Sequence, residues 1–257
     1  MTPLEKFIGL YTIMRREIVR VLRIWTQTLL PPAITTSLYF VIFGHVIGRR
    51  IGDMGGYTYI QFIAPGLIMM SIITSSYASS VSSFFSSKFQ RNIEEMLVSP
   101  MPNYVILLGF MMGGVVRGLL VGFIVAIIAL FFTHLQVYSV TSIILVALLS
   151  AMIFSLAGVI NAVFARKFDD IALVPTFILT PLTYLGGVFY SITLLPPVWR
   201  VLSLGNPIVY IVGAFRYGFL GVLSSHLWVS YMMMALFVVV LYGLAIYLLR
   251  NSIGLRE

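Results

Sequence analysis

The chain has 257 residues, of which 60% are hydrophobic and only 9% are charged. Water-soluble domains carry roughly 25% charged residues, and a globule of this length still needs a polar surface, so the composition excludes a soluble protein and indicates a membrane protein. The net charge of +8 is then expected to set orientation in the membrane rather than to bind nucleic acid. The absence of cysteine excludes disulfides and thiol chemistry.

Residues 1–24 are predicted to form an amphipathic helix in front of the first membrane span. One face carries apolar side chains at helical spacing, namely Leu4, Phe7, Ile8, Tyr11, Met14, Ile18, Val21, Leu22 and Trp25. The opposite face carries Glu5, Thr12, Arg16, Arg20 and Arg23. A basic amphipathic helix of this kind lies in the membrane interface. We interpret it as a topology anchor, and contact with a cytoplasmic partner is the alternative.

Six stretches are apolar over the roughly 20 residues that a helix needs to cross a bilayer. They are residues 25–47, 59–85, 105–132, 139–164, 171–190 and 227–249. Six crossings would place both termini on the same side. We therefore expect one transmembrane domain over residues 1–257, with an all-α fold.

The basic residues predict which side that is. Most of them fall in the loops on the side of the termini, namely Lys6, Arg15, Arg16, Arg20, Arg23, Lys88, Arg91, Arg166, Lys167, Arg250 and Arg256. The other loops hold only Arg49, Arg50, Arg200 and Arg216. Because Lys and Arg collect on the cytoplasmic side of membrane proteins, we expect both termini in the cytoplasm.

Small residues form regular patterns inside the second and third spans. In the second span, serines recur at every fourth position, at Ser71, Ser75, Ser79, Ser83 and Ser87. In the third span, glycines recur in the same way, at Gly109 and Gly113 and at Gly114, Gly118 and Gly122. Both patterns permit close helix packing. A serine stripe could also line a polar path, although packing is the favoured interpretation.

Arg117 is the one charged residue inside a predicted span. A charge at the centre of a membrane helix costs about 2.5–3.5 kcal/mol on insertion scales. Arg117 is therefore expected either to face a polar cavity or an anionic substrate, or to reach a carbonyl group or the interface with its long side chain.

Residues 86–103, SSKFQRNIEEMLVSPMPN, interrupt the apolar pattern between the second and third spans. A short amphipathic helix is predicted over residues 88–98. Its apolar stripe is Phe89, Ile93, Met96 and Leu97, and its polar face is Lys88, Arg91, Asn92 and Glu95. The cations precede the carboxylates, which is the unfavourable order for the helix dipole and for pairs four residues apart. That order is one indication that a partner uses the helix, but from these residues alone a helix lying on the lipid interface is the favoured interpretation.

The fifth span and the segment after it contain helix breakers. Pro175 and Pro181 predict kinks in the fifth span, as Pro31 and Pro32 do in the first. Residues 191–226 are too apolar for a solvated loop and too rich in Pro and Gly for a straight crossing. We expect short half-helices that enter the external leaflet and return.

No energy source is visible within the chain. Every carboxylate falls in a predicted loop or near the end of a span, although ion-driven carriers place ionisable groups inside the membrane. The phosphate-binding pattern G-x-x-x-x-G-K-[ST] is absent, as are the H-E-x-x-H and G-x-S-x-G patterns of hydrolases. A transporter with this sequence would have to receive its energy from another polypeptide.

Two segments resemble the ABC-2 type permeases, the membrane subunits of bacterial ATP-driven exporters. They are IEEMLVSPMPNYVILLG at residues 93–109 and PLTYLGGVFYSITLLPPVWRVLSLGNPIVYIVGAFRYGFLG at residues 181–221. The family pattern is an acidic helix and a Pro turn before the third span, then a G-G-V-F bend and an N-P-x-x-Y…R run. Here the second part falls on Gly186, Gly187, Val188, Phe189, Asn206, Pro207, Tyr210 and Arg216.

The resemblance implies a half-transporter of the bacterial inner membrane with a type V exporter-like fold. Two copies of this permease domain would pair with two separate ATP-binding subunits, which would hold ATP and Mg²⁺, so that this chain has no catalytic residue, metal or cofactor of its own. The segment at 86–103 would carry a coupling helix that docks into the ATPase through Arg91, Asn92, Ile93, Glu94, Glu95, Met96 and Leu97. Candidates for the translocation path or dimer interface are Arg117, Ser71, Ser75, Ser79, Asn206 and Arg216.

Two other functions remain open at the level of sequence. Arg117 and the serine stripe would also suit an ATP-independent channel or carrier. A membrane enzyme acting on lipids is the third hypothesis, and it lacks an acid–base pair at one depth. These residues do not identify the cargo of an exporter. Aromatic side chains near the predicted external side of the chain would suit an amphipathic or lipid-like substrate.

Overall fold

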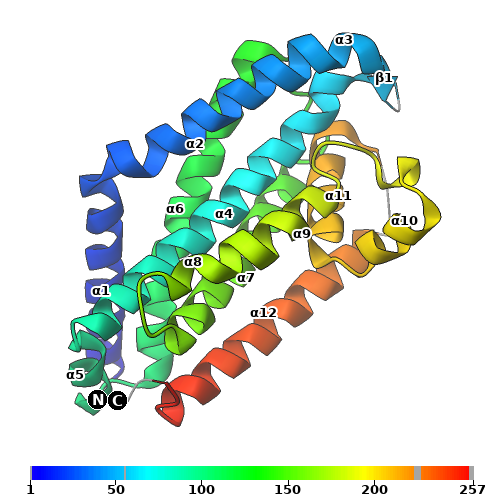
Figure 1. Cartoon of the computed structure of the whole chain (residues 1–257). Coiled ribbons are helices and arrows are strands. Elements are labelled where there is room, and N and C mark those ends of the chain that lie inside the picture. Colours follow the sequence, from blue (N-terminus) through cyan, green and yellow to red (C-terminus); the bar gives the residue numbers. More distant parts are fainter. Residues whose placement is uncertain (1, 55, 223–226, 255–257) are drawn as a thin grey trace.

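The computed structural model describes residues 2–54, 56–222 and 227–254, and helices dominate it (Figure 1). The first part of the chain has α1 (Pro3–Arg23), α2 (Trp25–Tyr39), the π-helix η1 (Phe40–Ile47), α3 (Gly48–Ile51), β1 (Asp53–Met54), β2 (Tyr57–Thr58), α4 (Tyr59–Phe89) and α5 (Asn92–Val98). The second part has α6 (Asn103–Phe132), α7 (Val140–Phe164), α8 (Asp170–Val174), the π-helix η2 (Pro175–Leu179), α9 (Thr180–Leu185), the 3₁₀ helix η3 (Ile192–Leu194), α10 (Pro197–Leu204), α11 (Pro207–Leu220) and α12 (Leu227–Arg250).

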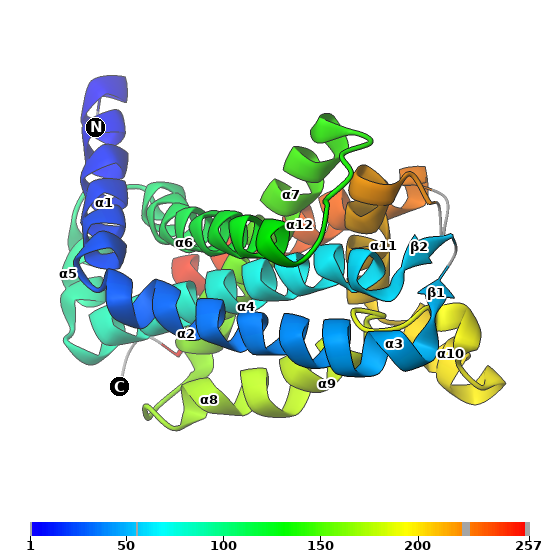
Figure 2. The ribbon, with the colours of Figure 1, turned by 90° about the horizontal axis from the view of Figure 1, so that it is seen from above.

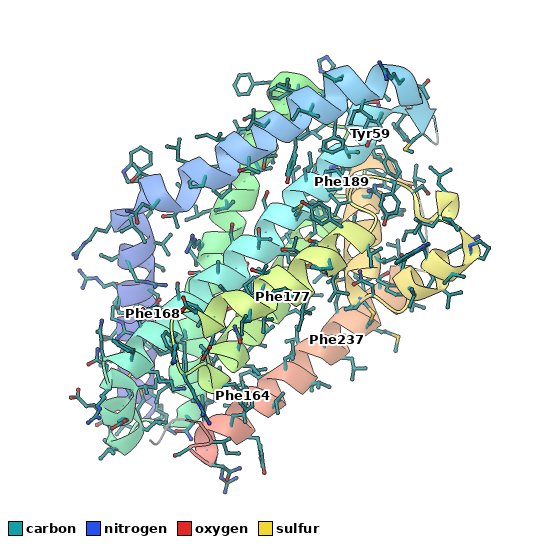
Figure 3. The ribbon with its side chains drawn as sticks, in the orientation of Figure 1. Tyr59, Phe164, Phe168, Phe177, Phe189 and Phe237 are labelled. Carbon is teal, nitrogen blue, oxygen red and sulfur yellow. The ribbon has the colours of Figure 1, made fainter. Side chains whose placement is uncertain are left out.

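Two ends of the bundle are easily told apart in Figure 1. The α5 end holds α5, the start of α1 and the end of α12, whereas the hairpin end holds α3, β1, β2 and α10. Figure 3 places Tyr59 and Phe189 near the hairpin end and Phe164 and Phe168 near the α5 end. Long helices run between the ends in alternating directions, as the predicted crossings require.

Four helices are long and apolar enough to cross a membrane within the described residues: α4, α6, α7 and α12. They match four of the predicted spans to within a few residues. The pair α10 and α11 would make a fifth candidate, but it bends by 85°. The remaining predicted spans fall on α2–η1–α3 and α8–η2–α9, whose π-helical segments interrupt them. The total of six crossings therefore stays a prediction.

The described part of the segment predicted to re-enter the membrane holds the 3₁₀ helix η3 and the helices α10 and α11. The 85° bend separates α10 from α11, and the side chain of Asn206 caps α11 by accepting a hydrogen bond from the N–H of Ile208 at 2.9 Å. This shape agrees with half-helices, and their depth in the bilayer stays a prediction. Residues 223–226 of the predicted segment lie outside the described residues, as do residues 1, 55 and 255–257 of the predicted domain.

The prediction of an all-α chain was wrong at one point. β1 and β2 form an antiparallel hairpin in which Asp53 faces Thr58 and Met54 faces Tyr57. The two residues between the strands are both glycines, a sequence that suits a two-residue hairpin turn. Hydropathy did not reveal the hairpin because it is short and lies between two apolar helices.

The helices of the second and fifth predicted spans end at other residues than the predicted spans do, and the limits of the spans in the membrane stay a prediction. The helix of the second span continues to Phe89 rather than ending at residue 85, and Arg91, with a φ of 62°, separates it from α5. The predicted helix over residues 88–98 is therefore divided between α4 and α5. The fifth span ends at Leu185 rather than at residue 190, because the chain turns at Gly187, which has a φ of +73°.

Pro175 begins the π-helical segment of α8–η2–α9, where the sequence predicts a kink. Pro175 has no N–H to donate to the carbonyl of Ile171. The side-chain amide of Asn161 in α7 approaches that carbonyl at 3.4 Å. At the end of the π-helical segment, the hydroxyl of Thr180 donates to the carbonyl of Pro175 at 2.8 Å. A neighbouring helix thus supplies a donor to the carbonyl that Pro175 cannot serve, and the Thr180 hydroxyl adds a second donor to the carbonyl of Pro175, which also accepts from the N–H of Thr180.

Candidate functional site

α5 is a short helix held at the end of the bundle by one apolar anchor. Ile93 is completely buried, and Met96 and Leu97 are half-buried against the same core. Arg91, Glu94 and Glu95 are exposed, and Val98 has 88% of its surface exposed. The helix therefore presents two carboxylates, one guanidinium and one apolar side chain on a surface that nothing else in the described chain covers.

The base of α5 is fixed to α4 and, through α4, to α7. The ammonium group of Lys88 in the last turn of α4 donates to the carbonyls of Val163 and Ala165, each at 2.7 Å. These carbonyls lie at the C-terminus of α7, where the helix dipole favours a cation. Lys88 thus belongs to a helix-to-helix contact rather than to the exposed face of α5, where the sequence pattern had placed it.

Aromatic side chains reinforce the same region. The ring of Phe168, in the connection between α7 and α8, packs edge-on against Phe85 at 4.9 Å and against Phe89 at 5.1 Å between centroids. Next to Phe168, Asp170 accepts hydrogen bonds from the backbone N–H groups of Arg166 and Lys167 at 2.8 and 3.0 Å. Those two hydrogen bonds lower the pKa of the Asp170 carboxyl.

α1 packs against α6 and α4 at a polar junction that could not be seen in the sequence pattern. The buried stripe of α1 includes Ile13, Glu17 and Val21, and glycines of α6 admit it: a Cβ atom at Gly113 would lie 2.6 Å from the Cβ of Glu17. Figure 2 shows that α1 runs across the direction of α4 and α6. Most of the apolar face predicted for α1 stays exposed on its other side.

Glu17 is the buried acid at this junction. Its carboxylate pairs with Arg20 at 3.0 Å and with Arg16 at 3.2 Å, and it accepts a hydrogen bond of 2.5 Å from the hydroxyl of Ser83. Burial lowers the pKa of Arg20, and the charge of Glu17 opposes that shift. One feature of the sequence could have indicated that Glu17 is buried. Glu17 lies four residues after Ile13 and four residues before Val21, and this spacing places all three on one face of the helix.

The serines of α4 lie mostly inside the bundle. Ser75 and Ser79 are buried, and Ser80 shares a hydrogen bond of 2.6 Å with Ser155 of α7. Glycines of α6 face the same stripe, because a Cβ atom at Gly114 or Gly118 would collide with the hydroxyls of Ser80 or Ser76. Ser76 and Ser80 thus take part in helix packing within one chain, and a role of Ser75 and Ser79 in a path or dimer interface stays a prediction.

Ser71 occupies a different place, on an open groove between α2 and α4. The groove has a volume of about 250 Å³ and is lined by hydroxyl-bearing and apolar side chains. Ser71 approaches Thr36 of α2 at 3.4 Å between their oxygens. Beside the groove, the hydroxyls of Tyr39 and Tyr184 link α2 to α9 at 3.5 Å. Of the predicted path residues, Ser71 is the one that the structure places at an open, partly polar surface.

Arg117, Asn206 and Arg216 are not brought together with Ser71. Arg117 is half-buried in α6, close enough to Arg20 for like-charge repulsion, and its Nε has no hydrogen-bond partner within the described residues. Asn206 and Arg216 lie in the hairpin half of the molecule, where Asn206 caps α11 and donates to the carbonyl of Leu182 at 2.6 Å. Whether any of them lines a path stays a prediction.

Arg216 is completely enclosed by protein and bound by backbone oxygens. It donates to the carbonyls of Phe62 at 3.1 Å, Gly187 at 2.8 Å and Val188 at 3.4 Å. Its guanidinium also lies 3.8 Å from the centre of the Phe62 ring. The arginine of the N-P-x-x-Y…R run therefore fastens α11 to α4 and to the G-G-V-F bend.

No group of three or more metal-ligating side chains is found among the residues that the structure describes. The arrangement offers a helix surface at the α5 end, a polar junction beside it and a partly polar groove along α2 and α4.

Comparison with known proteins supports the resemblance found in the sequence. The model of the ABC-2 type transporter family matches residues 9–220. The inner membrane transport permease YadH of Escherichia coli strain K12 is 56% identical over 98% of both chains. Nodulation protein J of Rhizobium leguminosarum bv. trifolii is 24% identical over 70% of this chain and 69% of its own length. This chain belongs to the ABC-2 type transporter family of membrane permeases.

Proposed function

We propose that this chain is the membrane subunit of an ATP-driven exporter in the bacterial inner membrane. Two copies would pair with two copies of a separate ATP-binding subunit, which would hold ATP and Mg²⁺. Membership of a transport permease family supports this assignment. So does the absence of the G-x-x-x-x-G-K-[ST] pattern from the chain, because energy must then come from a partner.

The observation that carries the proposal is the exposed surface of α5. Glu94, Glu95 and Val98 face outward, while Ile93 fixes the helix to the core. A partner that pushed on α5 would move α4 with it, since only the turn at Gln90 and Arg91 separates them. α4 is the most buried of the long helices, so its movement would reach α6 and α7 directly.

The groove between α2 and α4 suits the cargo that we propose. Its lining combines the hydroxyls of Thr35, Thr36, Ser71 and Thr74 with apolar and ring atoms of Leu67, Met70 and Tyr39. An amphipathic or lipid-like molecule presents both kinds of surface. A second copy of the chain facing this groove would convert an open surface into an enclosed path.

The test is ATP hydrolysis by the chain reconstituted with the ATP-binding subunit encoded beside it. We expect Glu94→Arg and Glu95→Arg to lower the hydrolysis rate of the complex severalfold, because a reversed charge opposes docking. Asp53→Arg, the same charge change at the hairpin end, should leave the rate unchanged. Wild-type rates in both α5 variants, with the complex intact, would count against coupling through this helix.

An ATP-independent channel or carrier is the second candidate, and Arg117 is the observation that favours it. A half-buried cation in a long apolar helix, with a buried Nε that lacks a partner in the described residues, is a feature of ion pathways. Ion flux through liposomes that contain the purified chain alone would support this candidate. Flux that requires the ATP-binding subunit and ATP would support the exporter.

A further inference from the structure

A cavity of about 510 Å³ lies between α1 and the α5 end of α4. Three arginines of α1, Arg16, Arg20 and Arg23, line it, and Asn92 from the first turn of α5 closes one side. It is separate from the groove between α2 and α4, because no residue lines both. Of the residues predicted to dock into the ATPase only Asn92 lines it, and none of the residues predicted for the translocation path does.

The cavity carries an excess of positive charge. Glu17 is the only acid in its lining, and that carboxylate is already shared between Arg16 and Arg20. Arg23 makes no ion pair within the described residues, and the side chains of Arg16 and Arg20 stay 42% and 32% exposed beside their ion pairs with Glu17. Guanidinium groups with spare donors bind phosphate oxygens well.

Apolar side chains line the same cavity. Val19 and Ile24 face it and have 44% and 39% of their surfaces exposed. Beside them in sequence, Leu22 and Trp25 are also exposed, at 55% and 57%. A soluble anion would leave this apolar surface in water, whereas a phospholipid would bring a phosphate to the arginines and hydrocarbon to Val19 and Ile24.

We propose that this cavity binds an anionic phospholipid of the surrounding membrane, with its phosphate held by Arg20 and Arg23 and its glycerol and acyl region against Val19 and Ile24. Basic pockets on the cytoplasmic side of membrane helices bind acidic headgroups, and the α5 end is the side that the basic residues predict to be cytoplasmic. The bound headgroup would lie beside Asn92 and would connect α1 to the start of α5.

The test is native mass spectrometry of the full chain in detergent, titrated with phosphatidylglycerol. We expect wild-type protein to retain one phosphatidylglycerol per chain in preference to phosphatidylcholine. Arg23→Gln should weaken that binding about tenfold, the effect of losing one charge-assisted contact. Arg23 is exposed and makes no ion pair in the described chain, so its substitution should leave the fold intact.

Arg15→Gln is the matched control, because Arg15 is exposed on the same helix but does not line the cavity. An unchanged affinity in Arg15→Gln, together with a loss in Arg23→Gln, would support the site. An equal loss in both variants would overturn it in favour of attraction to a basic helix as a whole. Displacement of the lipid by millimolar inorganic phosphate, or equal retention of phosphatidylcholine, would also overturn it. The experiment needs no ATP-binding subunit and is therefore independent of the proposed function.

Discussion

Arg216 and Lys88 are held by backbone carbonyl oxygens. Arg216 bonds to three of them and Lys88 to two. The chain has only eight acidic residues against sixteen basic ones, so in one-to-one pairs at least half of the cations are left without a carboxylate. A carbonyl carries partial negative charge and adds no net charge to the membrane interior, which makes it a suitable partner for a cation inside a membrane protein.

We expect Arg216→Met to destabilise the protein strongly. The substitution would leave the carbonyl of Gly187 and its neighbours without the donors they now have, and buried carbonyls without partners cost about 1–3 kcal/mol each. Arg200→Met is the control, because Arg200 is exposed on α10. Thermal unfolding in detergent should show a clear fall in midpoint for Arg216→Met and little change for Arg200→Met. Equal midpoints would show that Arg216 is not needed for the fold.

Close packing between α6 and α4 leads to a second prediction at the residue scale. In Gly114→Val, the added Cβ would lie 2.5 Å from the hydroxyl of Ser155 and 3.0 Å from the carbonyl of Ser76. Overpacking of this kind costs about 1–3 kcal/mol. Gly243→Val is the matched control, because nothing lies within 4 Å of a Cβ at that position. The unfolding midpoint should fall only in Gly114→Val, and a similar fall in both would point to glycine itself rather than to packing.

At the scale of elements, hydropathy located the long helices and the ends of α6, α7 and α12 to within one residue, but not the ends of α4 and α9. α4 continues to Phe89 because Lys88 finds its carbonyl partners, Val163 and Ala165, on another helix. Those partners are some 75 residues away in sequence, and no local pattern reveals them. α9 ends at Leu185 for a similar reason, since the bend after it is held by Arg216 from α11.

Lys88→Met tests whether that contact joins α4 to α7. Loss of the ammonium group should leave the last carbonyls of α7 without donors, so that this end of the helix frays. Hydrogen exchange at the backbone amides of residues 160–165 should become faster, while exchange in the middle of α7 should stay slow. Lys167→Met removes an exposed lysine nearby and should change neither. Unchanged exchange in Lys88→Met would mean that the cap contributes nothing to α7.

At the scale of the whole molecule, the family and the helical architecture could be predicted, but the position at which α1 packs against α6 and α4 could not. The amphipathic pattern of residues 1–24 identified a helix and its lipid-like face. The burial of Glu17 depends on Gly113 of α6, on Ser83 of α4 and on the approach of α1 to both. The candidate site could likewise be predicted only in part. The acidic residues of α5 could be identified from the sequence. The arginine-lined cavity beside α5 could not, because it forms only when three elements come together.

The count of crossings is the property of the whole molecule that now needs a measurement. Because the chain has no cysteine, single cysteines can be introduced and labelled with a maleimide that does not cross the inner membrane. Five positions are informative: Lys6, Asp53, Glu94, Lys167 and Thr193. Six crossings predict that cysteines at Asp53 and Thr193 are labelled from outside intact spheroplasts, and that the other three are labelled only after lysis.

The two interrupted spans make this test decisive. If α2–η1–α3 did not cross, Lys6→Cys would be labelled from the same side as Asp53→Cys. If α8–η2–α9 did not cross, Lys167→Cys and Thr193→Cys would be labelled from the same side as each other. The π-helical segment η2 does not prevent a crossing, since Asn161 donates to the carbonyl of Ile171, which has no donor in Pro175. We therefore expect opposite sides for both pairs, with α5 facing the cytoplasm, where an ATP-binding partner could reach it.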